Sequence, residues 1–314
     1  MGDLMHALPA ITEAKLNMPN LVFDWVVDKN FSSVPKWHPA INEVIETNHR
    51  EWKLNLFSSD SRNEIKQVIK TIEDNNYDLI VDMQNNLKSA FLSFLCKQPV
   101  AGMDARSSRE YPAHFAYKKK INVSKDMHAI QRQKSLLSSA LDYSTKISVD
   151  SYGIDKNKFS YSNKVSEKKY IVCVQNASWP TKQWPINYWQ ELICKLAVND
   201  MHLYFPSGNQ SELDRANEIC SASPKAKALD LMSLNEMAYL IDNASLSICS
   251  DTGLAHLSAV TNTPSLTLYG PTNPQLIGTY GEDQHHLLAK NSNITNISVN
   301  EVMSKLKDLA LIEF

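Results

Sequence analysis

Apolar and polar positions follow one another along the chain in blocks that predict buried strands and half-buried helices. Short apolar runs at 21–27, 77–82 and 170–174 are rich in Val, Ile, Leu and Tyr, as is typical of parallel strands that are buried on both faces. Segments such as 61–76 and 210–221 instead carry apolar residues at helical spacing. Strands that alternate with helices in this way predict an α/β protein with parallel sheets.

This alternation starts twice, which predicts two domains. A chain of 314 residues is longer than one typical core, and two α/β domains of roughly 150 residues each are the expected solution. Residues 151–167 are polar and rich in Lys and Ser, so we place the boundary there. We expect an N-terminal domain over 1–155, a C-terminal domain over 165–298 and a final amphipathic helix within 299–314.

Composition excludes several classes of protein. A hydrophobic content of 43% and a net charge of -2 describe a soluble globular protein and argue against a nucleic-acid partner. The five cysteines are odd in number, widely spaced and without a C-x-x-C pair, so they indicate reduced thiols. We find neither a signal peptide nor an apolar run of the ~18 residues that a membrane span needs. We therefore expect a cytoplasmic protein. Its basic cluster 118–120 can be solvated charge, a phosphate site or a membrane-facing surface.

Candidate chemistry is concentrated in residues 249–257, where the apolar run 246–249 ends in a polar turn that leads into a helix. Asp251 or Thr252 can cap that helix, and Gly253 lets a ligand approach the backbone amides. A helix N-terminus binds anions, and such turns line the ligand crevice of an open α/β sheet. The pattern predicts a phosphate ligand. For so short a motif, an ordinary strand-to-helix cap is the alternative.

A second apolar run is followed by Gly-Pro-Thr-Asn-Pro at 270–274, which predicts another rigid loop at the same sheet edge. Together, 251–256 and 270–274 resemble the signature of the lipopolysaccharide heptosyltransferases, glycosyltransferase family 9, which use ADP-heptose. Neither G-x-G-x-x-G nor the P-loop pattern occurs, which argues against a dinucleotide enzyme or a P-loop kinase.

The start of the chain also resembles this family. Gly2 and Asp3, with Leu-Pro-Ala at 8–10, match the beginning of the family's first helix, where the Asp is the proposed general base. Read without the resemblance, Asp3 is a helix cap. The family has about ten further residues before this point, forming the first strand of its N-terminal sheet. We expect that strand to be missing here, which would leave two neighbouring strands unpaired.

On the acceptor side the resemblance covers three segments. Residues 49–53 parallel a basic family segment, although Glu51 departs from it. The turn 82–89 parallels Asp-x-Gln-Gly-x-x-Lys-Ser, with Asn85 in place of Gly, and Asn tolerates the left-handed backbone that this turn needs. The loop 104–117 parallels an acceptor loop, though it can also be plain surface. The implied acceptor-binding residues are Arg50, Lys53, Gln84, Lys88 and Arg109.

On the donor side, residues 178–185 resemble a family loop that carries a hydroxyl group and then Lys-x-Trp-Pro. Lys182 would neutralise the departing diphosphate, where a fixed cation helps most. Residues 208–212 resemble the loop whose Glu binds ribose, and 231–234 the segment that reads adenine; Met232 would otherwise be core packing. The implied catalytic residues are Asp3 and Lys182, and the implied donor-binding residues are Ser178, Glu212, Met232, Asp251, Thr252, Gly253, Leu254 and His256.

The resemblance implies two Rossmann-like domains facing across a cleft, the GT-B arrangement, with the helix in 299–314 packing back toward the first domain. It implies an inverting transfer of heptose from ADP-L-glycero-D-manno-heptose to the Kdo of Kdo-lipid A in lipopolysaccharide inner-core biosynthesis. We expect no cofactor and no metal, a monomer, and peripheral association with the cytoplasmic face of the inner membrane. Three alternatives stay open: transfer to a later core heptose, a GT-B sugar-nucleotide epimerase, and a catalytically silent nucleotide binder.

Overall fold

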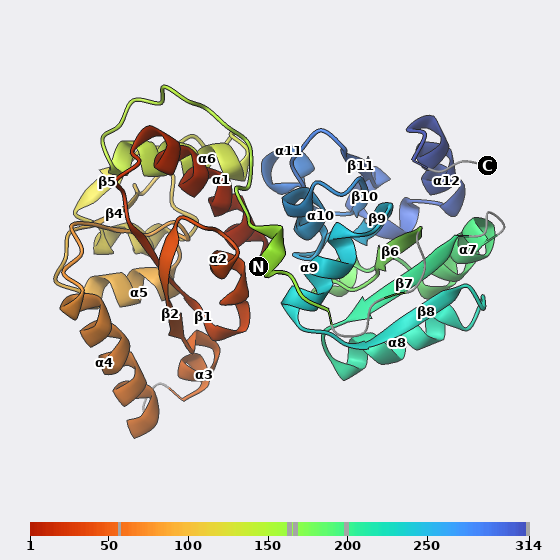
Figure 1. The fold of residues 1–314 in the computed structure, drawn as a ribbon, viewed down its shortest axis with the longest axis horizontal. Helices are drawn as coiled ribbons and strands as arrows, with labels where there is room; N and C mark the ends of the chain where they lie inside the picture. Colours follow the sequence, from red (N-terminus) through yellow and green to blue (C-terminus); the bar gives the residue numbers. More distant parts are fainter. Residues whose placement is uncertain (56–57, 162–164, 166–168, 198–200, 312–314) are drawn as a thin grey trace. The chain divides into compact units, whose positions relative to one another are not determined.

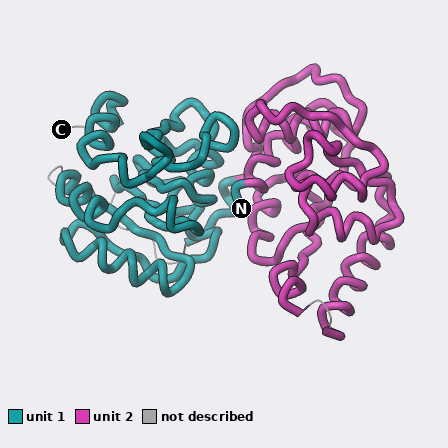
Figure 2. Tube along the Cα trace, turned by 180° about the vertical axis from the view of Figure 1, so that it is seen from behind, with its two compact units in different colours: residues 1–2, 156–314 teal, residues 3–155 magenta. Residues whose placement is uncertain are grey.

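The computed structural model describes residues 1–55, 58–161, 165, 169–197 and 201–311. The chain forms two compact units, which Figure 2 colours separately: Asp3–Asp155, and Lys156–Phe314 together with Met1–Gly2. The division after Asp155 falls within the polar segment where the sequence placed a domain boundary. Throughout the described ranges, every helix is too short or too polar to span a lipid bilayer.

The unit that begins at Lys156 is built on a parallel sheet (Figure 1). Among its described residues the sheet has six strands in the order β11-β10-β9-β6-β7-β8. From β6 the chain adds strands on one side and then returns to add the others on the opposite side of β6. The strands are β6 (Tyr170–Val174), β7 (His202–Ser207), β8 (Ala226–Leu231), β9 (Leu246–Ser250), β10 (Ser265–Tyr269) and β11 (Gln284–Leu288).

Helices connect these strands. Among them, α7 contacts both α8 and α12, and α9 contacts α10. Their buried faces complete the core of the unit, in which Trp184 and Trp189 pack edge to face with ring centroids 5.2 Å apart. The Trp184 indole N–H also donates to the Ile297 carbonyl at 2.8 Å. The helices are α7 (Ile186–Leu196), α8 (Gln210–Cys220), α9 (Leu234–Asp242), α10 (Ala255–Thr261), α11 (Pro274–Ile277) and α12 (Val299–Asp308).

The C-terminal helix α12 packs against α7 of its own unit. Val302 and Leu306 are fully buried in the same cluster as Trp189 of α7, and α12 contacts α7 directly. A helix of this length has one apolar face. Because α7 covers that face, the packing of α12 inside its own unit is established. Packing of the same helix toward the first domain stays a prediction.

The unit Asp3–Asp155 also contains only parallel pairings among its described strands, but they fall into two sheets. One pairs β1 (Phe23–Asp28) with β2 (Ile41–Thr47), and the other has the order β3 (Ile80–Val81), β4 (Val100–Met103), β5 (Lys119–Ile121). The run 77–82 was predicted as one strand, yet only two of its residues pair. The helices are α1 (Gly2–Asn17, whose first residue belongs to the other unit), α2 (Ser33–Lys36), α3 (His49–Leu54), α4 (Ser59–Asp74), α5 (Leu87–Leu95) and α6 (Ala129–Ala140).

Helix α1 is tied to the last segment of its unit by a buried charge cluster. The Lys134 ammonium on α6 lies 3.2 Å from Glu13 and 2.6 Å from Asp150, and the Lys134 and Glu13 side chains are 5% and 3% exposed. The Asn17 side chain accepts from the backbone N–H of Lys146 at 2.8 Å and donates to the Ile147 carbonyl at 2.8 Å. Buried charges are tolerated when they are paired in this way.

Candidate active site

The first part of the site lies where β6 and β9 are neighbours, the point at which the strand order reverses. In open α/β sheets the crevice beyond the carboxyl ends of the strands at such a point binds ligands. Lys182, in the loop after β6, lies with its ammonium 2.8 Å from the carboxylate of Asp251, in the loop after β9. Their side chains are 24% and 10% exposed. The structure therefore brings a predicted catalytic residue together with a predicted donor-binding residue.

The turn after β9 differs from the predicted cap. Helix α10 begins at Ala255, with Leu254 as its N-cap residue, and no side chain caps it. Instead the Ala255 N–H donates to the Thr252 carbonyl at 3.1 Å. Asp251 cannot act as the cap because its carboxylate lies four residues before the helix and pairs with Lys182. We therefore correct the prediction that Asp251 or Thr252 caps this helix.

Gly253 and His256 of this turn lie against the first residues of the chain. A Cβ on Gly253 would come within 2.9 Å of the Met1 Cε, and a Cβ on Gly2 within 3.0 Å of the His256 Cδ2. The Met1 side chain therefore packs against Gly253, and the approach of a ligand to its backbone amides stays a prediction. His256 is 7% exposed, whereas Thr252 and Leu254 are partly exposed.

The loop after β10 reaches the same region, as the sequence predicted. A Cβ on Gly270 would lie 3.3 Å from the Thr181 carbonyl oxygen and 3.1 Å from the Ile294 Cβ. Glycine at this position lets the 270–274 loop pack against the loop that carries Lys182. The site thus combines loops from the central strands β6, β9 and β10.

Arg215 on α8 holds the Lys182 loop by hydrogen bonds. The sequence analysis did not identify this residue. Its Nε donates to the Gln175 side-chain oxygen at 2.6 Å, and its Nη2 donates to the Trp184 carbonyl at 2.7 Å. Burial lowers the pKa of Arg215. Because Gln175 precedes the loop and Trp184 follows it, one guanidinium fixes both ends. These contacts join positions 31 and 40 residues apart, so no local spacing could have revealed them.

The other donor-side candidates lie in loops at the carboxyl ends of β6, β7 and β8. Ser178 is exposed in the loop after β6. Glu212, in the first turn of α8, accepts from the Gly208 N–H at 2.8 Å and is partly exposed. Met232 is 8% exposed, and its N–H donates to the Ser207 carbonyl at 2.9 Å. Met232 is therefore mostly covered by the protein, as a core residue would be.

On the acceptor side, the structure pairs Asp3 with Arg109. The Arg109 Nη1 donates to the Asp3 Oδ2 at 2.8 Å, and the side chains are 62% and 50% exposed. Asp3 lies inside the first turn of α1, so it is not that helix's cap. An exposed carboxylate held by a guanidinium is accessible to an incoming hydroxyl group and is fixed in direction.

The turn after β3 positions Gln84 and Lys88. Asn85 has φ +51°, so the left-handed conformation that the sequence predicted is confirmed. Asp82 accepts from the N–H groups of Gln84 and Asn85, both at 2.9 Å, and from the Tyr117 hydroxyl at 2.6 Å. Burial raises the pKa of Asp82, and these hydrogen bonds oppose that shift. The Gln84 and Lys88 side chains remain exposed.

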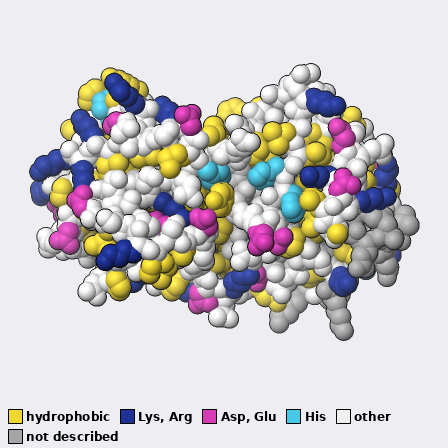
Figure 3. Space-filling model, turned by 90° about the horizontal axis from the view of Figure 1, so that it is seen from above, with side chains coloured by type: hydrophobic (Ala, Val, Ile, Leu, Met, Phe, Trp, Pro, Cys, Tyr) yellow, Lys and Arg dark blue, Asp and Glu magenta, His cyan; other side chains and the backbone are white. Residues whose placement is uncertain are grey.

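Arg50 and Lys53 lie on α3, which follows β2. The Arg50 guanidinium carbon lies 5.2 Å from the centre of the Phe31 ring, a cation–π contact, and Lys53 is exposed. Burial lowers the pKa of His49 at the start of this helix; the charge of Asp28 opposes this shift, and that of Lys88 adds to it. In Figure 3, Lys and Arg side chains are interspersed with hydrophobic ones on the visible face of residues 3–155.

Metal ligands are not grouped in the part of the chain that the structure describes: no cluster of three or more His, Cys, Asp or Glu side chains could hold an ion there. Lys182 and Arg215 both carry positive charge at the loop after β6. Burial raises the pKa of the Cys249 thiol, in the strand before Asp251, to about 12, so this cysteine stays protonated.

Known structures show the same fold over almost the whole chain. The structure titled "E. coli heptosyltransferase WaaC with ADP" matches with a TM-score of 0.90 and 33% identity, covering 98% of this chain and 97% of that one. The same enzyme with ADP-2-deoxy-2-fluoro heptose gives a TM-score of 0.88 at 32% identity, with coverages of 98% and 96%. The protein is therefore of the GT-B class of glycosyltransferases, with two Rossmann-like units.

Sequence comparison identifies the family. The profile of Glycosyltransferase family 9 (heptosyltransferase) matches residues 65–307. Lipopolysaccharide heptosyltransferase 1 of Pseudomonas aeruginosa is 37% identical over 288 residues, covering 91% of this chain and 81% of that protein. The chain belongs to glycosyltransferase family 9, and it is a glycosyltransferase.

Proposed function

We propose that this enzyme transfers heptose from ADP-L-glycero-D-manno-heptose to the Kdo of Kdo-lipid A, with inversion at the anomeric carbon. The observation that carries the proposal is the Lys182–Asp251 pair at the reversal of strand order, in a chain similar to an enzyme solved with ADP. The acceptor assignment is supported by 37% identity to a lipopolysaccharide heptosyltransferase 1.

Asp3 is the general base in this mechanism. It takes the proton from an acceptor hydroxyl group while that oxygen attacks the anomeric carbon of the heptose. The bond from the anomeric carbon to the diphosphate oxygen breaks as the new glycosidic bond forms, and ADP leaves on the opposite face. Arg109, 2.8 Å from Asp3, holds the carboxylate and binds the anionic acceptor.

Lys182 stabilises the departing diphosphate. Its ammonium, held by Asp251, also contacts a phosphate oxygen, and the charge that develops on the leaving group strengthens this second contact in the transition state. Ser178 and the 251–254 turn complete the diphosphate site, while Glu212 binds the ribose and Met232 lies against the adenine. Leu254 and His256 also bind the donor. A metal ion is not required when a lysine supplies the charge.

The acceptor is a lipid-anchored sugar with anionic groups. Exposed basic side chains on the unit Asp3–Asp155 can pair with these groups. Arg50, Lys53 and Lys88 bind its carboxylate or phosphate groups, and Gln84 donates to its hydroxyl groups. We propose that the enzyme works as a monomer at the cytoplasmic face of the inner membrane, where such an acceptor would be presented.

The test is release of ADP from ADP-heptose, measured with three acceptor conditions. Kdo-lipid A should give turnover, and an acceptor that already bears the first heptose should give at least tenfold less. ADP-heptose alone should stay unchanged. Conversion of the donor without an acceptor would indicate an epimerase, and preference for the heptose-bearing acceptor would indicate a later core step. ADP binding without any turnover would leave a silent nucleotide binder.

A further inference from the structure

Helix α5 and the short 3-10 helix η2 (Tyr111–Ala116) present an apolar surface that nothing in the unit covers. Their inner faces pack together through Ala90 and Ala113, which are 4% and 0% exposed. Their outer faces carry large side chains that remain in solvent. The exposed members are Leu87, Phe91, Phe94 and Leu95 of α5 with Tyr111 and Phe115 of η2, and we call them the aromatic surface.

The exposure of this surface is unusual for its residue types. Phe94 is 71% exposed and Phe115 is 68% exposed, although phenylalanine is normally buried. Apolar side chains exposed singly need no explanation, but a group on two adjoining elements marks an interaction site. The rings of Tyr111 and Phe115 also pack edge to face, with centroids 6.2 Å apart, so they project as one unit.

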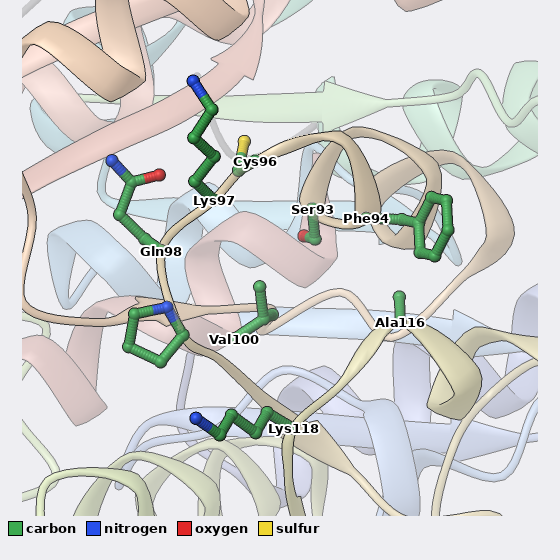
Figure 4. A pocket seen from close by; sticks show the side chains of 9 residues that line it. Ser93, Phe94, Cys96, Lys97, Gln98, Val100, Ala116 and Lys118 are labelled. Carbon is green, nitrogen blue, oxygen red and sulfur yellow. The ribbon is translucent and has the colours of Figure 1, made fainter.

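A small basic pocket borders the aromatic surface. It has a volume of about 240 Å3 and is lined by Ser93, Phe94, Lys97, Val100, Ala116 and Lys118, among others. In Figure 4, Phe94 lies at one end of it, and Lys97 and Lys118 lie toward the other. The volume is below that of a typical site for a drug-sized molecule, but it can accept a phosphate head group.

Charge favours an anionic partner. Lys118 has no ion-pair partner among the described residues, and the neighbouring Lys120 is exposed. Lys97 pairs with Glu73 at 2.9 Å but keeps 83% of its side chain exposed. Glu110, next to η2, is exposed, and its carboxylate accepts from the Leu87 N–H at 2.8 Å. Aromatic rings flanked by lysines suit the interface of a bilayer that contains anionic lipid.

We propose that the aromatic surface and its basic pocket are the part of the protein that binds the membrane. The phenylalanine rings enter the head-group region, and Lys97 and Lys118 contact lipid phosphates. This inference rests on the proposed function for its context, because a lipid-anchored acceptor gives the enzyme a reason to bind a bilayer. It goes further by naming the surface and the lipid charge that the surface recognises.

Vesicle flotation tests the proposal directly. The unmodified enzyme should float with vesicles of phosphatidylethanolamine and phosphatidylglycerol, and at least fivefold less with phosphatidylcholine alone. The double variant Phe91→Ser, Phe94→Ser should lose about tenfold in partitioning. The variant Lys118→Gln should lose about fivefold, an effect that salt should mask. Val22→Ser and Lys66→Gln serve as matched controls, because both residues are exposed in the same unit outside the surface.

Kinetics with two acceptors separate this proposal from the proposed function. The phenylalanine variant should retain normal kcat/KM on a deacylated, water-soluble acceptor and lose activity on the acceptor in vesicles. If the unmodified enzyme fails on both acceptors, the proposed function is wrong, while flotation still decides on lipid binding. Equal flotation of the variant and the enzyme overturns the proposal. So does a dimer that the phenylalanine variant dissociates without any change in lipid binding, because the surface would then bind a second copy.

Discussion

Replacing Lys182 with alanine perturbs one short ion pair. The Lys182 Nζ lies 2.8 Å from the Asp251 Oδ2, and at an effective dielectric constant of ~20 two unit charges at this separation attract by about 6 kcal/mol. Desolvation cancels much of that attraction in the resting enzyme. The leaving diphosphate gains charge during the reaction, however, so the same ammonium contributes more in the transition state. Loss of one such group should lower kcat by about 10²–10³, or about 3–4 kcal/mol.

The Lys182→Ala substitution should also lower the stability of the folded enzyme. Asp251 is 10% exposed, so without Lys182 its carboxylate is left poorly solvated, and the free energy of unfolding should fall by about 1–3 kcal/mol. Urea denaturation measures this loss, and single-turnover release of ADP measures the chemical step. Lys195→Ala is the control: it removes a 2.9 Å pair with Glu191 on α7 in the same unit, and both measurements should stay nearly unchanged.

Two results would refute this reasoning. A Lys182→Ala enzyme with kcat within threefold of the unmodified enzyme would show that the ammonium does not stabilise the leaving group. A loss confined to KM for the donor, with kcat preserved, would show equal binding in ground and transition states. In either case Lys182 would be a binding or structural residue, and another group would have to neutralise the diphosphate.

Three further predictions follow from particular contacts. Arg109→Ala should raise KM for the acceptor about tenfold and lower kcat, because the 2.8 Å contact of Arg109 holds Asp3. KM for the donor should stay unchanged. Steady-state kinetics with each substrate varied in turn tests this, and a change in the donor KM instead would show that Arg109 does not act on the acceptor side. Asn85→Ala should destabilise the enzyme by about 2–3 kcal/mol in urea, because alanine disfavours φ +51° and loses the hydrogen bond from the Met103 N–H, whereas Asn85→Gly should restore the backbone part of that loss. In native enzyme at pH 8, Ellman's reagent should react rapidly with exposed Cys194. Burial raises the pKa of Cys249 to about 12, so less than about one part in a thousand is thiolate and this thiol should react only after unfolding. Peptide mapping identifies the labelled thiols, and rapid labelling of Cys249 would contradict its buried placement.

Local patterns in the sequence predicted most of the strands and loops of the unit that begins at Lys156. Strands β6 and β9, the polar turns after them and the loop at 270–274 all follow from apolar runs and turn residues. The left-handed residue Asn85 was predictable too, since few residues adopt that conformation readily. Such features depend on neighbours within a few positions, which is the range that a single sequence reports well.

Features that depend on distant partners were missed or wrong. Arg215 on α8 holds the Lys182 loop through Gln175 and Trp184, which lie far from it in the sequence. No pattern of residue spacing predicts these hydrogen bonds. Asp251 looked like a helix cap because caps share its residue type, but its carboxylate pairs with a lysine 69 residues away. The apolar face of α12 was visible in the sequence, whereas its covering by α7 was not. A hydrophobic pattern predicts that one face of a helix is buried. Only the fold shows which element covers that face.

In the unit Asp3–Asp155, the first helix, α1, is held to the last segment, 146–150, by hydrogen bonds of Asn17 and by the ion pairs of Lys134. The two ends of this unit therefore lie together. Releasing either end removes one of the two carboxylates from Lys134, whose side chain is 5% exposed, so the buried ammonium would be left with a single partner. Hydrogen exchange at the two ends should therefore rise and fall together. A unit joined at its ends in this way is also a natural candidate for circular permutation, with new termini opened in a surface loop elsewhere.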